Sequence, residues 1–279
     1  MKKILTAIIA LCAATAVTDA QENIRADYDF TSLQLRTDSM ATTRFTLVSG
    51  PGRSLFFNTM SLYVDSLTST PEGKKRLNEI QWAAWKVDQP DGSFKLDLTR
   101  QAPRKTVRMY VEKDFGNSEL KLYNRFGEDD GYYTEPFDEL KWEIQTDSTA
   151  TVLGYECFMA TTHYHGREWK GWFAPEIPVQ DGPWKLQGLP GLILKAEADN
   201  GTVITATGIQ ATGEAVPPMY QTDTYTRMDR KKALGDEEHF RNNFQSTLAA
   251  QGVRISNKDG SPYTAPKFER ERHALETDY

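Results

Sequence analysis

Residues 182–194 read GPWKLQGLPGLIL, and five of these thirteen residues are glycine or proline. The segment 189–192, Leu-Pro-Gly-Leu, fits a type II turn, because proline presets φ at the second position and glycine accepts a positive φ at the third. Gly188 adds a position at which another backbone segment can approach closely. The apolar end of the stretch is typical of the start of a strand that is buried on both faces. We therefore predict a rigid corner with the ring of Trp184 packed over it.

The corner has two interpretations. In the first, it closes one end of a sheet and its aromatic rings fill the protein core. In the second, the turns and the neighbouring rings form the rim of a cleft that binds an apolar or sugar-like ligand. The candidate binding residues for the second interpretation are Arg167, Trp169, Trp172, Glu176 and Trp184.

Runs of β-branched and aromatic residues, bounded by turn residues, account for most of the chain after residue 42. They predict strands over residues 43–48, 54–58, 106–112, 119–126, 140–145, 151–164, 168–174, 192–198 and 202–210. Two connections predict hairpins: the turn at Gly166-Arg167, and Asp199-Asn200-Gly201, where Asn-Gly separates two alternating apolar runs.

Two segments have helical periodicity. Residues 71–86 carry apolar side chains at a spacing that a helix can use. In residues 228–251, Phe240, Phe244 and Leu248 recur at i, i+4 and i+8 and therefore lie on one face. The residues expected to face solvent are Asp236, Glu237 and Arg241.

Together these elements predict a mainly β fold, an antiparallel curved sheet or half-barrel with one or two helices. Residues 21–279 are expected to form a single β-rich domain, since no repeat or low-complexity linker interrupts them. The polar residues 256–279 are expected to be partly mobile.

The first twenty residues have the layout of a secretory signal. A basic start at residues 1–3 precedes an apolar run, Ile4–Val17, and a small residue, Ala20, at the expected cleavage position. The run is shorter than the roughly 20 residues that span a bilayer. Cys12 offers an alternative as a lipoprotein cysteine, although the preceding Leu11 is larger than that signal requires. We expect cleavage after Ala20 and a periplasmic or extracellular location.

The charge of the chain limits its partners. Removing residues 1–20 takes away two lysines and one aspartate and moves the formal charge from −6 to −7. An acidic protein of this kind is not expected to bind nucleic acid or anionic lipid as its main partner. No later stretch is apolar enough to predict a transmembrane segment in the mature chain.

An ordered set of motifs spans Gly154 to Leu194. They are Gly154-Tyr155, Cys157, Ala160, Gly166-Arg167, Trp169, Trp172-Phe173, Pro175-Glu176-Ile177-Pro178, Gly182-Pro183-Trp184-Lys185, and the corner residues Gly188, Leu189, Pro190, Gly191, Leu192, Ile193 and Leu194. This set resembles the GLPGLI family, a Porphyromonas-type family of Bacteroidetes, as do residues 54–65 and 270–277. The resemblance implies an exported, β-rich protein. It implies no particular chemistry, because the biochemical role of the family is not established.

Cys157, His163 and His165 raise the alternative of a metal carrier. With Cys12 in the leader, Cys157 has no partner for an internal disulfide, and its alternating apolar setting predicts a small buried hydrophobe. In an extended strand the three side chains would point to the same side, and a thiolate with two imidazoles could bind zinc or copper. Cys157 can join the histidines only if the strand folds back. We therefore expect no metal and no cofactor.

Paired carboxylates raise a second alternative, a peptidase-like hydrolase. Glu176 and Asp181 flank the bend at Pro178, and two carboxylates can perform acid–base chemistry when one pKa is raised. Arg167 could anchor Glu176 through a bidentate pair, and Cys157 is a further candidate nucleophile. No serine lies in a nucleophile elbow, and no glycine-rich phosphate loop is present.

The interpretation that we favour from the sequence is a non-catalytic binding or accessory protein of the cell envelope. Its sheet would present an aromatic-lined face to an unknown ligand or to an outer-membrane protein. This interpretation depends on the signal segment, the strands, the clustered aromatic residues and the lack of a recognised catalytic motif.

Overall fold

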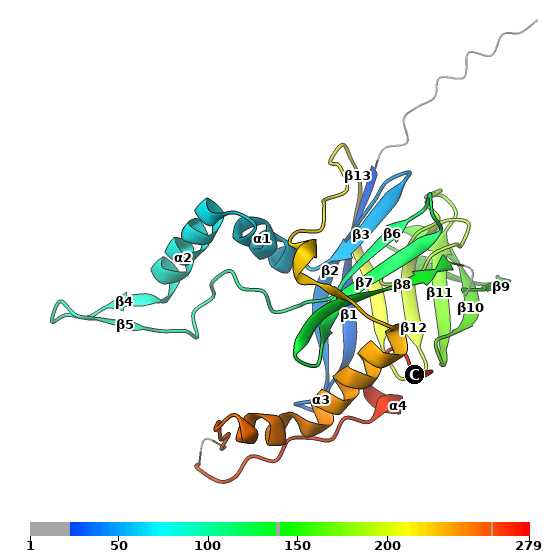
Figure 1. The fold of residues 1–279 in the computed structure, drawn as a ribbon. Helices are drawn as coiled ribbons and strands as arrows, with labels where there is room; N and C mark the ends of the chain where they lie inside the picture. The colour runs from blue at the N-terminus through cyan, green and yellow to red at the C-terminus, as the bar shows by residue number, and fades with distance from the viewer. Residues whose placement is uncertain (1–22, 138–139, 258) are drawn as a thin grey trace, which may run out of the picture.

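Most of the described chain forms one long sheet (Figure 1). The computed structural model describes residues 23–137, 140–257 and 259–279, so the predicted signal segment 1–20 lies outside the described residues. The strands are β1 (Asn23–Gln34), β2 (Ser39–Ser49), β3 (Arg53–Phe57), β6 (Tyr110–Asp114), β7 (Glu119–Phe126), β8 (Asp129–Pro136), β9 (Glu143–Val152), β10 (Tyr155–Tyr164), β11 (Arg167–Ala174), β12 (Leu192–Ala198), β13 (Val203–Thr212) and β14 (Thr226–Arg227). Their order in the sheet is β14-β8-β7-β6-β3-β2-β1-β13-β12-β11-β10-β9.

The pairing of these strands confirms the predicted mainly β fold. Neighbouring strands are antiparallel, except for β14 and β8, which are parallel. Both predicted hairpins are confirmed, because β10 pairs with β11 around Gly166 and β12 pairs with β13 around Asn200-Gly201.

One predicted strand is wrong at its start. The structure divides residues 151–164 between β9 and β10, because Leu153 and Gly154 have φ angles of 52° and 85° and form a tight turn. Two successive residues with positive φ suit the turns that match the twist of paired strands.

The helices are α1 (Thr59–Thr68), α2 (Pro71–Trp85), α3 (Arg230–Ala250) and α4 (Arg270–His273), with a short 3-10 turn at Thr222–Thr224. The structure confirms the two predicted helices as α2 and α3, whereas α1 and α4 exceed the one or two helices expected. Asn58 caps α1 by accepting a hydrogen bond from the backbone N–H of Ser61 at 3.0 Å. None of the described helices is long and apolar enough to cross a membrane.

The sheet curves around residues 175–191, the segment between β11 and β12. Its central residues 181–187 are buried, and we call these the inner segment. Trp184 stacks on Trp169 of β11 with ring centroids 5.3 Å apart, while the Nζ atom of Lys185 contacts Glu135 of β8. Strands β8 and β11 lie near opposite ends of the strand order, so both can contact one short segment only because the sheet is curved. The predicted curvature is therefore confirmed.

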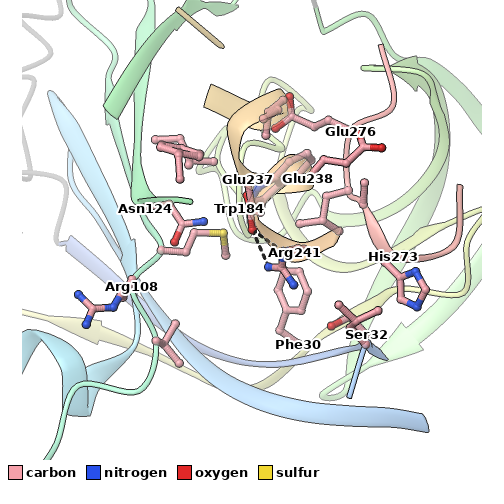
Figure 2. Close-up of a pocket in the computed structure, with 18 of the residues that line it drawn as sticks. Phe30, Ser32, Arg108, Asn124, Trp184, Glu237, Glu238, Arg241, His273 and Glu276 are labelled. Carbon is pink, nitrogen blue, oxygen red and sulfur yellow. Dashed lines mark hydrogen bonds and ion pairs between the residues drawn. The ribbon is translucent and has the colours of Figure 1, made fainter. Parts of the chain in front are cut away.

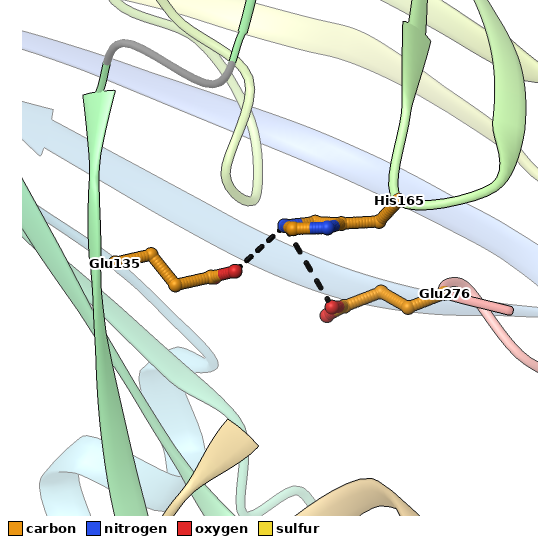
Figure 3. Close-up of side chains that lie close together, drawn as sticks. All are labelled: Glu135, His165 and Glu276. Atoms are coloured by element: carbon orange, nitrogen blue, oxygen red, sulfur yellow. Dashed lines mark ion pairs between the residues drawn. The ribbon is translucent and has the colours of Figure 1, made fainter. Parts of the chain in front are cut away.

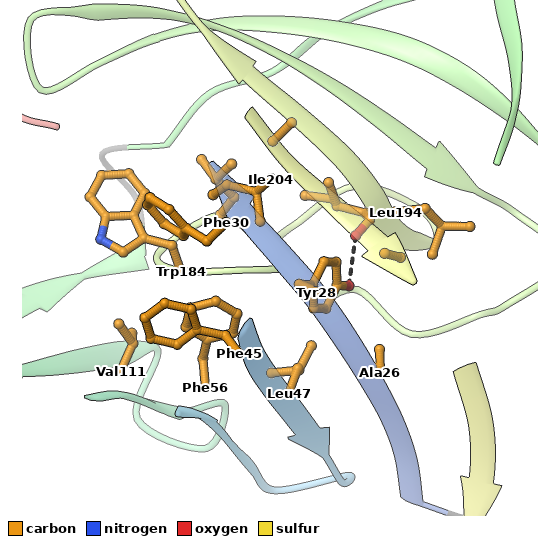
Figure 4. Packing of buried hydrophobic residues seen from close by; sticks show 14 of the residues in the cluster. Ala26, Tyr28, Phe30, Phe45, Leu47, Phe56, Val111, Trp184, Leu194 and Ile204 are labelled. Atoms are coloured by element: carbon orange, nitrogen blue, oxygen red, sulfur yellow. Dashed lines mark hydrogen bonds between the residues drawn. The ribbon is translucent and has the colours of Figure 1, made fainter. Parts of the chain in front are cut away.

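Aromatic rings from three neighbouring strands meet the inner segment in the core (Figure 4). The rings of Phe45 and Phe56 stack with centroids 4.7 Å apart, and Phe30 tilts against Phe45 at 5.5 Å. The Tyr28 hydroxyl donates to the carbonyl O of Ile193 at 2.8 Å and joins β1 to β12. Trp184 and Leu186 are buried in the same hydrophobic cluster, so the inner segment is part of the core rather than a surface loop.

The predicted corner is present, but its turn is tighter than a type II turn. The N–H of Gly191 donates to the carbonyl O of Leu189 at 2.8 Å, so the bond spans only i to i+2 around Pro190. Gly191 has a φ of 156°, far from the value of about 80° in a type II turn. The close backbone approach occurs at Gly191, where an added Cβ would overlap the carbonyl O of Ala174, and not at Gly188, where it would meet nothing within 4 Å.

Part of the C-terminal tail packs against the body of the protein, whereas the expectation that residues 256–279 are partly mobile stays a prediction. Phe268 and Glu276 are buried. The Nη2 atom of Arg167 donates to the carbonyl O atoms of Arg270, Glu271 and Ala274 at 3.0, 2.7 and 2.8 Å. One buried guanidinium thus satisfies three carbonyl groups and ties residues 270–274 to β11.

Candidate functional site

Lys113 is a fully buried cation that fixes the inner segment. Strand alternation places it on the same face of β6 as Val111. Its Nζ donates to Oδ1 of Asp181 at 2.6 Å and to the carbonyl O atoms of Gly182 and Leu186 at 2.8 and 2.9 Å. Burial lowers the pKa of Lys113, and Asp181 counteracts this effect. The three acceptors match the three protons of an ammonium group, so the arrangement suits the charged form.

A second buried charge cluster lies where the inner segment meets β8 and the C-terminal tail. The Nζ atom of Lys185 contacts Glu135, lies 2.7 Å from Oε1 of Glu276, and sits 4.7 Å from the ring centroid of Tyr133. Arg230, at the start of α3, adds an Nη1 contact to Oε2 of Glu276 at 2.5 Å. These ion pairs connect four parts of the chain that lie far apart in sequence.

His165 completes this cluster (Figure 3). The turn between β10 and β11 directs its Nε2 toward Oε1 of Glu135 at 2.6 Å and Oε2 of Glu276 at 3.9 Å. Ligand-type atoms of these three residues lie within 4.8 Å of one another, a spacing that a metal ion could use. However, Lys185 contacts both carboxylates, and a divalent ion would have to displace it. The geometry therefore favours a structural cluster with its own cations.

The cluster makes stability depend on pH. Burial alone would raise the pKa of Glu135, but Lys185 and His165 outweigh burial and hold it at about 2, below the usual 4.5. Because the folded pKa lies below the unfolded one, the carboxylate stabilises the fold above about pH 4.5, and this contribution is lost as the pH falls toward about 2. We expect a loss of roughly 2–3 kcal/mol over this range in urea unfolding.

The control for this prediction is Glu135→Gln, which cannot titrate. It should be less stable than the wild type at neutral pH and should show a flatter dependence on pH between about 4.5 and about 2. If the free energy of unfolding changed equally with pH in the two proteins, Glu135 would not be the source of the pH dependence.

A cavity of about 330 Å³ lies between the concave face of the sheet and the layer formed by α3 and the C-terminal tail (Figure 2). Its floor consists of apolar and aromatic side chains: Phe30, Phe45, Leu122, Phe126, Tyr133 and Trp184. Its rim is polar, with Ser32, Arg108, Asn124, Glu237, Arg241 and His273. The cavity is at the small end of the range for ligand sites, which is about 300–1,000 Å³.

The main charged groups on the rim already have partners. Nη2 of Arg241 lies 2.5 Å from Oε1 of Glu237, and its guanidinium lies 5.4 Å from the ring centroid of Phe268. Nη1 of Arg108 lies 3.4 Å from Oδ1 of Asp130. The prediction that Glu237 and Arg241 simply face solvent is thus incomplete, because both line the cavity. The rim can offer hydrogen bonds without a large excess of either charge.

Two of the candidate binding residues lie in the core. Trp169 and Trp184 are 1% and 0% exposed, so they do not form an open aromatic face. Trp184 nevertheless lies at the base of the cavity. Trp172 is half-buried beneath Lys195, whose Nζ is 4.7 Å from its ring centroid. The curvature of the sheet encloses Trp169 and Trp184 on its inner face, whereas a binding role for these residues stays a prediction.

The other two candidate binding residues also lie apart. Arg167 is buried and serves the C-terminal tail, whereas Glu176 is exposed. Asp181 is buried and paired with Lys113. The carboxylates of Glu176 and Asp181 are therefore in different environments and do not form the paired site that a hydrolase would need.

The three proposed metal ligands do not lie together. A bulge between Phe158 and Met159 shifts the alternation of β10, so Cys157 is buried while the His163 side chain is 65% exposed and contacts Glu168. The prediction that all three side chains point to one side is wrong for this reason. Burial raises the pKa of the Cys157 thiol, which suits the interpretation as a small buried hydrophobe.

Comparisons with known proteins leave the activity of this chain open. A solved structure described as PNGF-II has a TM-score of 0.50 and 13% identity, and the alignment covers 79% of this chain and 33% of that one. Another crystal form of PNGF-II has a TM-score of 0.48 and 13% identity, and the alignment covers 79% of this chain and 34% of that one. A putative outer membrane lipoprotein-sorting protein domain from Vibrio parahaemolyticus gives 0.23, with 7% identity over 78% and 92%. This chain spans about a third of PNGF-II, and at that identity the likeness concerns the fold alone.

Comparison with curated proteins gave no match. The family model described as "Protein of unknown function (Porph_ging)" matches residues 165–195, from His165 through the inner segment to the start of β12. The segment that fills the curved sheet therefore matches the Porph_ging family, which confirms the resemblance to the GLPGLI family.

Proposed function

We propose that this protein is exported to the cell envelope and binds a small amphipathic molecule in the cavity under α3, without catalysing a reaction. Export is supported by the secretory layout of residues 1–20 and by the family resemblance. The observation that carries the binding proposal is the cavity of about 330 Å³ with an aromatic floor and a polar rim.

The lining of the cavity supports an amphipathic ligand. An apolar part of the ligand would rest on rings such as Phe30 and Phe126, which lose water contact at little cost. A polar, uncharged head would find hydrogen-bonding groups at Ser32 and Asn124 on the rim. A strongly charged head is disfavoured, because the rim arginines are already paired.

Binding rather than catalysis is supported by the surroundings of the candidate catalytic groups. Asp181 is neutralised by Lys113, and the Cys157 thiol has a pKa raised by burial. Glu176 is exposed and lies apart from both. None of these three groups lines the cavity.

The proposal predicts that a dansyl-labelled fatty alcohol of medium chain length, which has an uncharged polar head, binds the purified full chain with increased fluorescence. Asn124→Trp, which fills the cavity from β7, should weaken this binding at least about tenfold, because a single buried ring excludes the probe. Ser32→Trp narrows the same cavity from the rim and serves as a second variant should Asn124→Trp fold poorly.

Gln210→Trp is the matched control, since it adds the same ring at an exposed position on β13. It should leave the affinity unchanged. If both cavity variants bound the probe with the affinity of the wild type, the cavity would not be the binding site. Reproducible turnover of an ester or peptide substrate, lost in the cavity variants, would refute the non-catalytic role.

A further inference from the structure

Residues 270–279 form one wall of the cavity, and we call them the strap. The strap consists of α4 and residues 274–279. His273, Leu275 and Tyr279 line the cavity together with Ala274 and Glu276 (Figure 2). The opposite walls come from the sheet and from α3. A ligand in the cavity would therefore contact the strap as well as the aromatic floor.

The strap lacks the regular backbone pairing of the other walls. None of its residues belongs to a strand of the described sheet, and α4 has only four residues. Residues 106–109 also border the cavity, but they run directly into β6, and Val107 and Met109 pack against the core. Segments with few backbone hydrogen bonds and few apolar contacts open locally at the lowest cost. Of these walls, the strap can therefore move with the least disruption of the fold.

Polar contacts hold the strap against the turn between β10 and β11. The N–H of Thr277 donates to the carbonyl O of His165 at 2.9 Å, and its Oγ1 donates to the carbonyl O of Gly166 at 3.0 Å. Arg167, which follows in the chain, donates to three carbonyl groups of the strap. The hydrophobic residue of the strap that packs against the main core cluster is Leu275.

The nature of these contacts favours a closed strap that can still open. Lifting the strap removes acceptors from Arg167 and separates Lys185 from Glu276, so the closed state is the resting state. In the open state, however, water can solvate the freed cations and carbonyl groups. Opening exposes little apolar surface from the strap itself, because Leu275 supplies most of its packing.

We propose that the strap opens to admit the ligand and then closes over it. This inference rests on the proposed function, since it concerns the route into the same cavity. A bound ligand that contacts Leu275 and Tyr279 would add to the contacts of the closed strap and would thereby slow its own release.

A disulfide between the strap and the β10–β11 turn tests this proposal. A Cβ added at Gly166 lies 3.3 Å from the Cβ of Thr277, close to the range of about 3.5–4.5 Å found in disulfides. Cys157 is buried and does not compete, and Cys12 is replaced by serine. In oxidised Gly166→Cys/Thr277→Cys, stopped-flow fluorescence should show the dansyl-labelled fatty alcohol associating at least about tenfold more slowly than after reduction with dithiothreitol.

The single variant Gly166→Cys is the matched control for the disulfide. Gly166 has a φ of 76°, so the single variant carries the same backbone strain without the link. Its association rate should not depend on dithiothreitol. If the oxidised and reduced forms of the double variant bound the probe at the same rate, the strap would not be the route of entry.

Thr277→Val tests the strap without a cysteine, should the double variant fold poorly. It keeps the shape of the side chain but removes the hydrogen bond to Gly166, so the probe should leave about two- to tenfold faster. Thr207→Val also removes a hydroxyl that donates to a carbonyl O, at an exposed position on β13, and should leave the release rate unchanged.

The outcomes separate the strap from the binding site itself. If Thr277→Val released the probe at the rate of the wild type, the proposal that the strap closes over the ligand would be wrong, while binding in the cavity would stand. A wild type that does not bind the probe would overturn the proposed function and, with it, the route into the cavity.

Discussion

Replacement of Lys113 by methionine is expected to destabilise the folded protein by about 3–5 kcal/mol. The lysine is fully buried and gives all three of its protons to acceptors on the inner segment. Methionine fills a similar volume but leaves Asp181 as a buried charge without its cation, and it leaves two carbonyl groups without donors. Urea unfolding followed by circular dichroism measures the loss directly.

Two controls distinguish this effect from a general sensitivity to lysine substitution. Lys121→Met removes a partly exposed lysine from the neighbouring strand β7 and should change the stability by no more than about 0.5 kcal/mol. The double variant Lys113→Met/Asp181→Asn removes both charges and should be more stable than Lys113→Met alone. A double variant that is no better would mean that the ion pair is not the source of the effect.

Gly191→Ala is expected to cost about 3 kcal/mol or more, from steric overlap and backbone strain together. An alanine Cβ would overlap the carbonyl O of Ala174, and it would lie 2.6 Å from the carbonyl C of that residue and 2.9 Å from the N of Pro175. These are backbone atoms of the same corner and cannot rotate away. The substitution should lower the midpoint of thermal unfolding and loosen the link between β11 and β12.

Gly188→Ala is the matched comparison in the same loop. Gly188 has a φ of 89°, but an added Cβ meets nothing within 4 Å, so only the conformational cost of about 1–2 kcal/mol applies. Equal losses for the two variants would show that the contact with Ala174 does not matter.

Local features of this fold could be predicted from the sequence, because they depend on residues close together in the chain. The hairpin at Asn200-Gly201, the helices over 71–86 and 228–251, and the corner before Leu192 all follow from turn chemistry or periodicity. The type II turn and the strand over 151–164 were wrong in detail. At the corner, the close approach of Ala174 constrains the backbone of Gly191. In the predicted strand, Leu153 and Gly154 form a tight turn.

The buried charges could not be assigned from the sequence, because their partners are distant along the chain. Lys113 is paired with Asp181, and Glu135 with Lys185. A signal was nevertheless present: Lys113 and Glu135 each follow an inward-facing residue, Val111 or Tyr133, by two positions. Strand alternation places such pairs on the same face, so a charged residue in that register is a candidate for a buried ion pair.

The aromatic residues show where a local sequence pattern leaves two interpretations open. Four aromatic rings between residues 169 and 184 suggested a binding face. Whether they form one depends on which face of the sheet they occupy. Curvature of the sheet decided this point by enclosing Trp169 and Trp184. The cavity instead depends on α3 and the C-terminal tail, which are brought to the sheet by contacts over a long sequence distance.

The pairing of Lys185 with Glu276 has a consequence for how the molecule matures. The ribosome makes Lys185 91 residues before Glu276, so the ammonium group cannot acquire this counter-ion until that whole intervening segment has also been made. Until then Glu135 is the carboxylate of this cluster that has already been made, so the cluster is completed late in folding. Truncation before Glu276 should accordingly yield a product that an added protease cleaves faster than the full chain.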